Sequence, residues 1–200
     1  MNRLIHKLRC QLSKNRMGRF IWNNYWHELF YPYGCEPAVT RCIAEGPWQG
    51  GVFWDVGAFV GRYTWRFAAN FKQIVAFEPN MHSVQFLCWN TRHLNNVVIL
   101  PCALTRDGKT KRATCQPNFQ SKPEGPSVAT IAVRSAIESY GHPSLVKLDV
   151  EGAEMELLKE PLLRMTTLIV EWHGTRNIVD KQYWKETQLD KTHSLLAHLT

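Results

Sequence analysis

The sequence predicts an α/β protein with an open, mostly parallel sheet that carries helices on both faces. From Gly51 onward, short apolar runs alternate with stretches of helical periodicity, and the apolar runs have no polar face. Strands without a polar face need cover on both sides, which helices on each face of a parallel sheet supply. At 200 residues the chain is long enough for one such domain without disulfide or metal support.

Ahead of Gly51 the pattern is helical. Apolar and aromatic residues at helical spacing predict two short helices before the turn-prone segment 31–34. A further helix is predicted over 36–45, and the Gly46-Pro47 pair ends it.

Beyond Gly51 the elements follow one another at regular intervals. The predicted strands cover 52–56, 74–77, 97–100, 145–150 and 168–170, and the run 128–133 is also compatible with a strand. The helices between them end near Asn70 or cover 82–94, 134–140 and 153–160. The polar, Gly- and Pro-containing stretch 106–127 predicts an irregular excursion or a short hairpin.

Polar residues at the strand ends are the candidates for chemistry, because ligands of such sheets bind outside the carboxyl ends of the strands. These residues are Asp55, Glu78, Asp149, Glu151, Glu171 and His173.

The first strand-to-helix turn reads D-x-G-x-x-x-G from Asp55 to Gly61. Glycines there let the backbone turn tightly and approach a ligand beside the positive end of a helix. The spacing matches neither the dinucleotide fingerprint nor the phosphate-binding loop. Glu78 ends the second strand, where an acidic residue meets ribose hydroxyls in such folds. Together, the turn and the acid favour an adenosyl ligand over a purely structural turn.

Four charged residues surround the end of the strand that begins at residue 145. Glu151 and Glu154 lie near a predicted helix amino terminus, where negative charge is favoured by about 0.3–1 kcal/mol, and this alone accounts for Glu154. Asp149 ends a central strand and faces the expected cleft. Lys147 either neutralises a neighbouring acid or lies at the sheet edge.

Glu171 and His173 add a carboxylate and an imidazole to the same rim. His173 can take a proton from a hydroxyl near neutral pH, although a lone histidine is more often structural. Together with Asp149 and Glu151 these residues are also compatible with a divalent cation. No metal-specific spacing accompanies them, so we predict no metal site.

In combination, these motifs resemble the FkbM family of S-adenosylmethionine-dependent methyltransferases. The matching pieces are 55–58 with 61–64, 77–80, Asn90 and Asn95, 103–104, the K-x-D-x-E-G-x-E segment 147–154 and the E-x-H segment 171–173. They follow the family's order over about residues 36–175, which makes the resemblance more specific than any single motif.

The resemblance implies a Rossmann-like class I methyltransferase fold that binds S-adenosylmethionine. The implied cofactor-binding residues are Asp55, Gly57, Ala58, Gly61, Glu78, Pro79, Asn80, Ala103 and Asp149. In the family's arrangement the loop 55–61 flanks the methionine part, Glu78 holds the ribose hydroxyls, and the segments 79–80 and 102–103 border the adenine. The implied catalytic candidates, which face the methyl group and the acceptor, are Asp149, Glu151, Glu171 and His173.

Two features depart from the family pattern. Phe59 stands where the family usually has Asn, which puts the contacts of the cofactor loop in question. The sequence also has no clear pattern for the last antiparallel hairpin, and this leaves open a shortened sheet with an incomplete acceptor pocket.

The implied reaction is methyl transfer from S-adenosylmethionine to a hydroxyl of a small molecule, sugar or natural product. Two alternatives stay open: a cofactor-binding module without turnover, and a nucleic-acid methyltransferase that docks through a basic amino terminus. A nicotinamide oxidoreductase is disfavoured because its glycine fingerprint is missing.

The net charge of +7 is concentrated at the amino terminus. Residues 1–27 contain six of the 24 Lys and Arg residues and no Asp or Glu: Arg3, Lys7, Arg9, Lys14, Arg16 and Arg19. The remaining 18 cations against 17 acids leave residues 28–200 with a net charge of +1, which argues against a large nucleic-acid-binding face. We therefore divide the chain into a basic, aromatic-rich helical arm, 1–35, and a methyltransferase domain, 36–200.

Several properties of the whole chain follow from composition. No apolar run approaches the roughly 18 residues of a membrane span, and no signal-peptide core is visible, so we expect a cytoplasmic protein. The basic arm suits peripheral contact with an anionic membrane, organelle targeting or packing as an extra helix. Six cysteines without a C-x-x-C pair predict mostly buried free thiols. The oligomeric state is not indicated by the sequence.

Overall fold

The computed structural model describes residues 36–109, 111–112, 127–173 and 179–199. The chain separates into two compact units, Met1–Arg41 and Cys42–Thr200. Helix α3 (Pro37–Glu45) spans the division between them. The two helices predicted in the arm lie outside the described residues.

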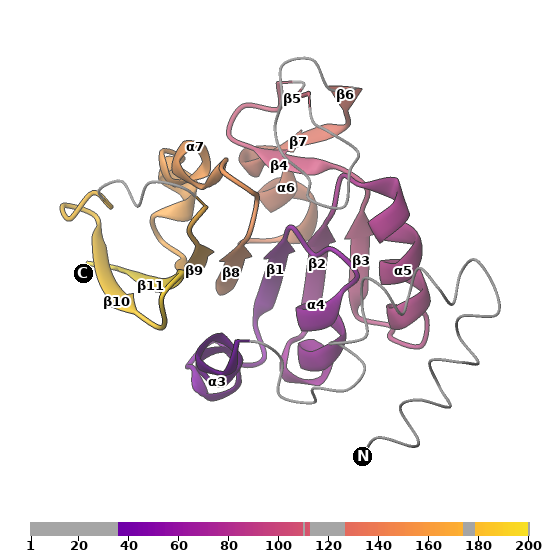
Figure 1. Cartoon of the computed structure of the whole chain (residues 1–200), viewed down its shortest axis with the longest axis horizontal. Coiled ribbons are helices and arrows are strands. Elements are labelled where there is room, and N and C mark those ends of the chain that lie inside the picture. The colour runs from indigo at the N-terminus through magenta and orange to yellow at the C-terminus, as the bar shows by residue number, and fades with distance from the viewer. Residues whose placement is uncertain (1–35, 110, 113–126, 174–178, 200) are drawn as a thin grey trace. The chain divides into compact units, whose positions relative to one another are not determined.

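A seven-stranded sheet organises the second unit and confirms the predicted fold class (Figure 1). Its strand order is β10-β11-β9-β8-β1-β2-β3. The strands are β1 (Val52–Val56), β2 (Gln73–Phe77), β3 (Val97–Leu100), β8 (Leu145–Leu148), β9 (Thr167–Glu171), β10 (Trp184–Gln188) and β11 (His193–His198). The five strands from β9 to β3 run parallel, and β11 is antiparallel to both of its neighbours.

Helices cover both faces of this sheet. They are α4 (Arg62–Phe67), α5 (Met81–Thr91), α6 (Val133–Tyr140) and α7 (Glu154–Leu158), with the 3-10 helices η1 (Ala68–Asn70) and η2 (Pro161–Leu163). Because crossovers are right-handed and the strand order changes direction after β3, α4 and α5 lie on one face and α6 and α7 on the other. Leu87 of α5 accordingly belongs to the same buried cluster as Ala76 of β2, whereas Ala136 of α6 and Leu157 of α7 belong to the cluster that contains Val75.

Two short strand pairs lie outside the main sheet. β4 (Ala103–Thr105) runs parallel to β7 (Thr130–Ala132), and β5 (Lys111–Arg112) runs antiparallel to β6 (Ser127–Val128). The apolar run predicted as one strand over 128–133 is therefore shared between two separate pairs. The predicted excursion leaves and returns through the β5–β6 pair, and residues 113–126 within it lie outside the described part of the chain.

The carboxyl-terminal hairpin is present, so the possibility of a shortened sheet, which the sequence left open, is wrong. β10 pairs antiparallel with β11, and β11 pairs antiparallel with β9. Residues 185–188 of β10 are all exposed and polar, and β11 opens with His193 and Ser194. An edge strand of this kind carries no continuous apolar run, so its sequence resembles a loop.

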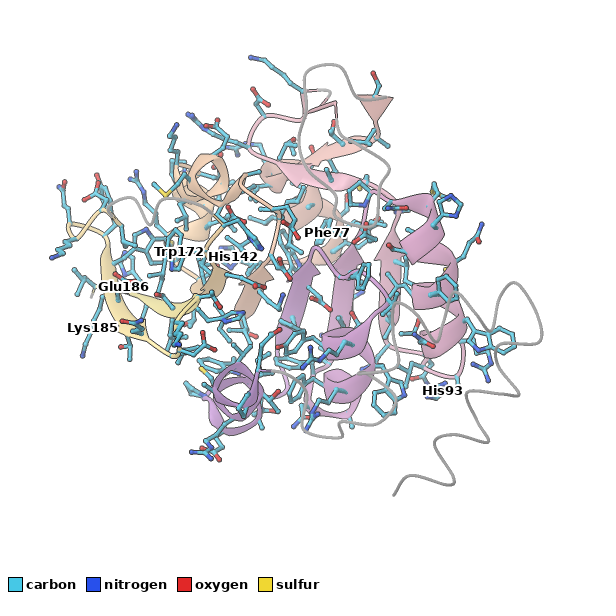
Figure 2. All side chains as sticks on the ribbon, in the orientation of Figure 1. Phe77, His93, His142, Trp172, Lys185 and Glu186 are labelled. Carbon is cyan, nitrogen blue, oxygen red and sulfur yellow. The ribbon has the colours of Figure 1, made fainter. Side chains whose placement is uncertain are left out.

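Aromatic packing shows how strand alternation divides β1 between the two faces. Trp54 meets Phe77 edge to face at 5.3 Å between ring centroids, and Phe77 is labelled in Figure 2. Phe53, which points to the opposite face, stacks on Phe71 at 5.0 Å. Since side chains two residues apart share a face, Asp55 follows Phe53 onto the face that α4 covers.

Two predictions from composition can be compared with this part of the chain. Cys42, Cys88 and Cys102 are free, as predicted, but Cys88 is exposed and the other two are partly exposed, so the prediction of burial is wrong for them. None of the helices among the described residues has the length and apolarity of a membrane span.

Replacing Gly57 with Ala should lower the free energy of unfolding by more than about 2 kcal/mol. The φ angle of Gly57 is +81°, and an added Cβ would lie 1.7 Å from the backbone oxygen of Asp149. The left-handed conformation alone costs an L-residue about 1–2 kcal/mol, and the collision adds to this. Urea unfolding measures the loss.

Gly50→Ala is the matched control, because Gly50 has a φ of +76° and open space where the Cβ would stand. It isolates the conformational part, about 1–2 kcal/mol. Equal losses in the two variants would contradict the close approach of the two loops.

Candidate functional site

Strand alternation brings four acidic side chains to one rim of the sheet. Asp55 lies opposite Lys147 in the β1–β8 pair, and Asp149 follows Lys147 by two residues. The registers of β2 against β1 and of β9 against β8 place Glu78 and Glu171 in the same phase. Residues in phase across parallel strands share a face. The strand ends predicted from sequence therefore converge on the face that carries α4.

Thr64 of α4 binds one carboxylate oxygen of Asp55, and the other oxygen accepts no hydrogen bond from the described residues. Its side chain is 1% exposed, and Oδ2 accepts hydrogen bonds from the backbone N–H of Thr64 at 3.0 Å and from its hydroxyl at 2.6 Å. Oδ1 is buried and has no hydrogen-bond partner within the described part of the chain. Burial raises the pKa of Asp55, while Lys147 and Thr64 oppose the rise. A buried acceptor without a partner is a place for a donor from a ligand.

The glycine-containing loop is held by its backbone. The N–H groups of Gly57 and Ala58 donate to the carbonyl of Phe77 at 2.9 and 3.0 Å. Phe59 adopts a φ of +52°, and its N–H donates to Oε2 of Glu78 at 2.8 Å. This contact does not depend on the side chain at position 59, so the departure from the family's Asn leaves it intact.

Glu78 is a buried carboxylate with two backbone donors. Oε2 receives the N–H of Phe59, and Oε1 receives the N–H of Asn80 at 2.8 Å. Burial raises the pKa of Glu78 to about 7, although both N–H groups act in the opposite direction. Each carboxylate oxygen has a second lone pair, so Glu78 can still accept two hydroxyl donors.

Two more predicted cofactor-binding residues, Asn80 and Ala103, and the family-motif residue Asn90 make hydrogen bonds in this part of the structure. Asn80 caps α5 by accepting the N–H of His82 at 3.0 Å. Asn90 of α5 donates to the carbonyl of Val60 at 2.8 Å, which ties α5 to the loop. Ala103 opens β4 and donates its N–H to Ala129, so its place at the adenine stays a prediction.

Lys147 neutralises a neighbouring acid, which is one of the two roles that the sequence allowed. Its side chain is 2% exposed, and its Nζ lies 2.8 Å from Oδ2 of Asp149 and 4.9 Å from the ring centroid of Tyr63. Burial tends to raise the pKa of Asp149, but Lys147, a hydrogen bond with Glu171 and the charge of His173 together lower it. Asp149 is therefore a stable anion at the rim.

His173 lies among carboxylates just beyond the end of β9. Its Nδ1 lies 3.0 Å from Oε1 of Glu154. Its Nε2 lies 3.6 Å from Glu151, 3.8 Å from Asp149 and 3.9 Å from Glu171. Partial burial opposes the charged form, but the hydrogen bond with Glu154 and the three carboxylates raise the pKa of His173.

The sequence explains Glu154 as a negative charge at a helix amino terminus, but in the structure Glu154 also contacts His173. It is 3% exposed, and Oε1 accepts the N–H of Gly152 at 3.1 Å as well as facing His173. Its neighbour Glu151 has a φ of +53°, and burial raises the pKa of Glu151 together with nearby carboxylates, although the charge of His173 opposes the rise. Three carboxylates of the loop 149–154 thus lie within 4 Å of the imidazole of His173.

The cluster is also compact enough for a cation. One donor atom from each of Asp149, Glu171 and His173 lies within 4.8 Å of the others. Lys147 already supplies a positive charge to Asp149 at 2.8 Å. The absence of a metal from this site stays a prediction.

Two functional candidates escaped the sequence analysis. His193 lies directly opposite Glu171 in the β11–β9 pair, and its Nε2 is 3.4 Å from Oε2 of Glu171. Its Nδ1 is 2.9 Å from Oδ1 of Asp190. Only the pairing of the hairpin places His193 beside Glu171, and that hairpin has no clear pattern in the sequence.

The profile of the methyltransferase FkbM domain matches residues 55–198, which include all the candidate residues described above. The protein belongs to the FkbM methyltransferase family. The family resemblance proposed from the motifs is thereby confirmed.

Two methyltransferases similar to this chain give the assignment its context. Hexuronic acid methyltransferase AglP from Haloferax volcanii is 28% identical over 152 residues, covering 70% of this chain and 63% of that protein. Methyltransferase FkbM from Methylobacillus flagellatus KT has a TM-score of 0.51 at 16% identity, covering 74% of this chain and 43% of that one. The chain therefore spans less than two thirds of either protein. The structural match supports the Rossmann-like class I fold.

Glu78 should make folding less favourable as the pH rises from about 4.5 to about 7. Over this range the unfolded chain releases the proton at the usual pKa of 4.5, whereas the folded chain holds it until the raised pKa of about 7. Compared with Glu78→Gln, which does not titrate, the wild-type protein should lose about 3 kcal/mol of unfolding free energy between pH 4 and pH 8.

Urea unfolding at each pH measures this difference, and the exposed Glu138 offers a matched control as Glu138→Gln. A wild-type and Glu78→Gln pair with parallel pH profiles would show that the Glu78 carboxyl is solvated.

Proposed function

We propose that this FkbM-family protein transfers a methyl group from S-adenosylmethionine to a hydroxyl of a small-molecule or carbohydrate acceptor. The proposal rests on one arrangement: two buried carboxylates at the ends of β1 and β2 stand beside a carboxylate–imidazole cluster at the ends of β8 and β9. Membership of the family and the similarity to a hexuronic acid methyltransferase support it.

The cofactor end fits the chemistry of an adenosyl sulfonium compound. Oδ1 of Asp55, buried and without a described partner, suits an ammonium donor of the methionine part. The remaining lone pairs of Glu78 suit the two hydroxyls of a ribose. When bound, S-adenosylmethionine supplies a methyl group on a positively charged sulfur, so the protein mainly has to align the acceptor oxygen.

His173 is the better placed of the two bases considered from sequence. Lys147 holds Asp149 as a carboxylate whose pKa is lowered, which makes Asp149 a weak proton acceptor. Nε2 of His173 faces the rim while Glu154 binds Nδ1 and orients the ring. As the acceptor oxygen gains the methyl group, its proton passes to Nε2, and the surrounding carboxylates stabilise the resulting imidazolium.

The alternatives now differ in their support. A binding module without turnover would suit an incomplete sheet or a disturbed cofactor loop, but the hairpin is formed and the N–H of Phe59 donates to Glu78. Nucleic-acid docking depends on the arm, which lies outside the described residues. We therefore keep hydroxyl methylation as the function that the site supports best.

Glu78→Ala should weaken the binding of S-adenosylmethionine at least about tenfold, because it removes both acceptors for a vicinal diol. Isothermal titration calorimetry measures the dissociation constant. Glu138→Ala removes an exposed glutamate of α6 and serves as the control. Unchanged affinity in Glu78→Ala would count against the cofactor site.

His173→Gln should lower kcat about 100-fold or more and leave cofactor affinity unchanged. The assay uses methyl-labelled cofactor, a panel of hydroxylated acceptors that includes hexuronosides, and cell extract, and it detects a product about 14 mass units heavier by mass spectrometry. Because a base must be unprotonated, wild-type kcat/KM should rise with pH through a pKa above the usual 6.5 of histidine.

His93→Gln is the control for this experiment, since His93 is exposed and labelled apart from the rim in Figure 2. A His173→Gln enzyme with the wild-type rate would remove His173 as the base. A wild-type protein that methylates no acceptor would remove the proposed function.

A further inference from the structure

A buried histidine links the acceptor end of the site to the turn of the carboxyl-terminal hairpin. His193 begins β11, and its side chain is 2% exposed. Nδ1 lies 2.9 and 3.1 Å from the two carboxylate oxygens of Asp190, and Nε2 lies 3.4 Å from Oε2 of Glu171. Because His193 and Glu171 are direct partners in the antiparallel pair, the backbone itself keeps the two side chains close.

Asp190 fixes the orientation of this imidazole. Its Oδ1 accepts the backbone N–H groups of Thr192 and His193, each at 2.9 Å, so the turn holds the carboxylate in place. A carboxylate is an acceptor only, which requires Nδ1 of His193 to carry the proton between them. Nε2 must also carry a proton to attract the carboxylate of Glu171, so the ring between the two acids acts as an imidazolium that pairs with Glu171 at 3.4 Å.

Glu171 divides its two oxygens between His193 and the acceptor end of the rim. Oε2 faces Nε2 of His193 at 3.4 Å, and Oε1 faces Nε2 of His173 at 3.9 Å. A glutamate at a strand end has several side-chain rotamers of similar energy. The contact with His193 favours the rotamer that sends the second oxygen toward His173.

We propose that His193 is a positioning residue for methyl transfer, which holds the Glu171 carboxylate toward His173. The inference rests on the proposed function. A correctly aimed carboxylate stabilises the imidazolium that forms when Nε2 of His173 takes the acceptor's proton. No proton passes through His193, and the methyl group does not contact it. Its removal should therefore lower kcat and leave cofactor binding unchanged.

Two substitutions separate this role from a merely structural one. In His193→Gln the side-chain amide takes the place of Nε2, and its NH2 group can donate to Glu171. In His193→Asn the amide takes the place of Nδ1 and can still donate to Asp190, but it does not reach Glu171. Positioning of Glu171 predicts that His193→Asn loses about tenfold or more in kcat and that His193→Gln keeps most of it. Anchoring of the turn predicts the reverse order.

The experiment measures kcat and KM of the full chain with the acceptor identified by mass spectrometry. Calorimetry with S-adenosylmethionine establishes that each variant is folded. Lys191→Ala, which removes an exposed side chain of the same turn, is the control. The double variant Glu171→Gln with His193→Asn should be no slower than Glu171→Gln alone, because His193 acts through Glu171.

Asp190→Asn provides a second route if a substitution at the buried position prevents folding, since the Asp190 side chain is 32% exposed. It should lower kcat severalfold without a change in cofactor affinity. Wild-type kcat in both Asp190→Asn and His193→Asn would overturn the role of His193 while leaving methyl transfer in place. A wild-type protein that binds the cofactor and methylates no acceptor would overturn the proposed function, and this inference with it.

Discussion

The buried ammonium of Lys147 is the interaction on which the rest of the site depends. It lies under the rim among carboxylates, pairs with Asp149 at 2.8 Å and rests over the ring of Tyr63 from α4. An unpaired buried charge is strongly unfavourable, so removing either Lys147 or Asp149 alone would destabilise the fold. Its positive charge also opposes the rise in the pKa of Asp55 that burial causes. One side chain thus links Asp55 at the end of β1 with Asp149 beyond the end of β8.

The second constraint is the alternation of side chains along the strands. Asp55, Lys147, Asp149 and Glu171 point to the face that α4 covers, while Trp54 and Phe77 fill the opposite face. A slip of one residue in any pairing would send an acid into the apolar layer. The strand registers that bury the apolar side chains on one face therefore also place the polar side chains of the rim together on the other face.

Local motifs could be predicted from the sequence because the residues that define each motif lie within a few positions of one another. The loop 55–61, Glu78 and the segment 147–154 are of this kind, and the structure places all three at the expected strand ends. The contact of Glu154 with His173 and that of Glu171 with His193 could not be predicted, since each joins residues brought together only by the fold. The hairpin was missed for a related reason: its outer strand is polar and exposed.

The contact between Gly57 and the backbone of Asp149 has a consequence for protein engineering. The two loops meet so closely that a single methyl group would not fit between them, and the N–H of Asp149 also donates to the carbonyl of Val56. A change in the backbone of one loop would therefore displace the backbone of the other. A redesign of the proposed acceptor site must therefore change side chains that line the rim, such as Glu151, and not the length of the loop at either strand end.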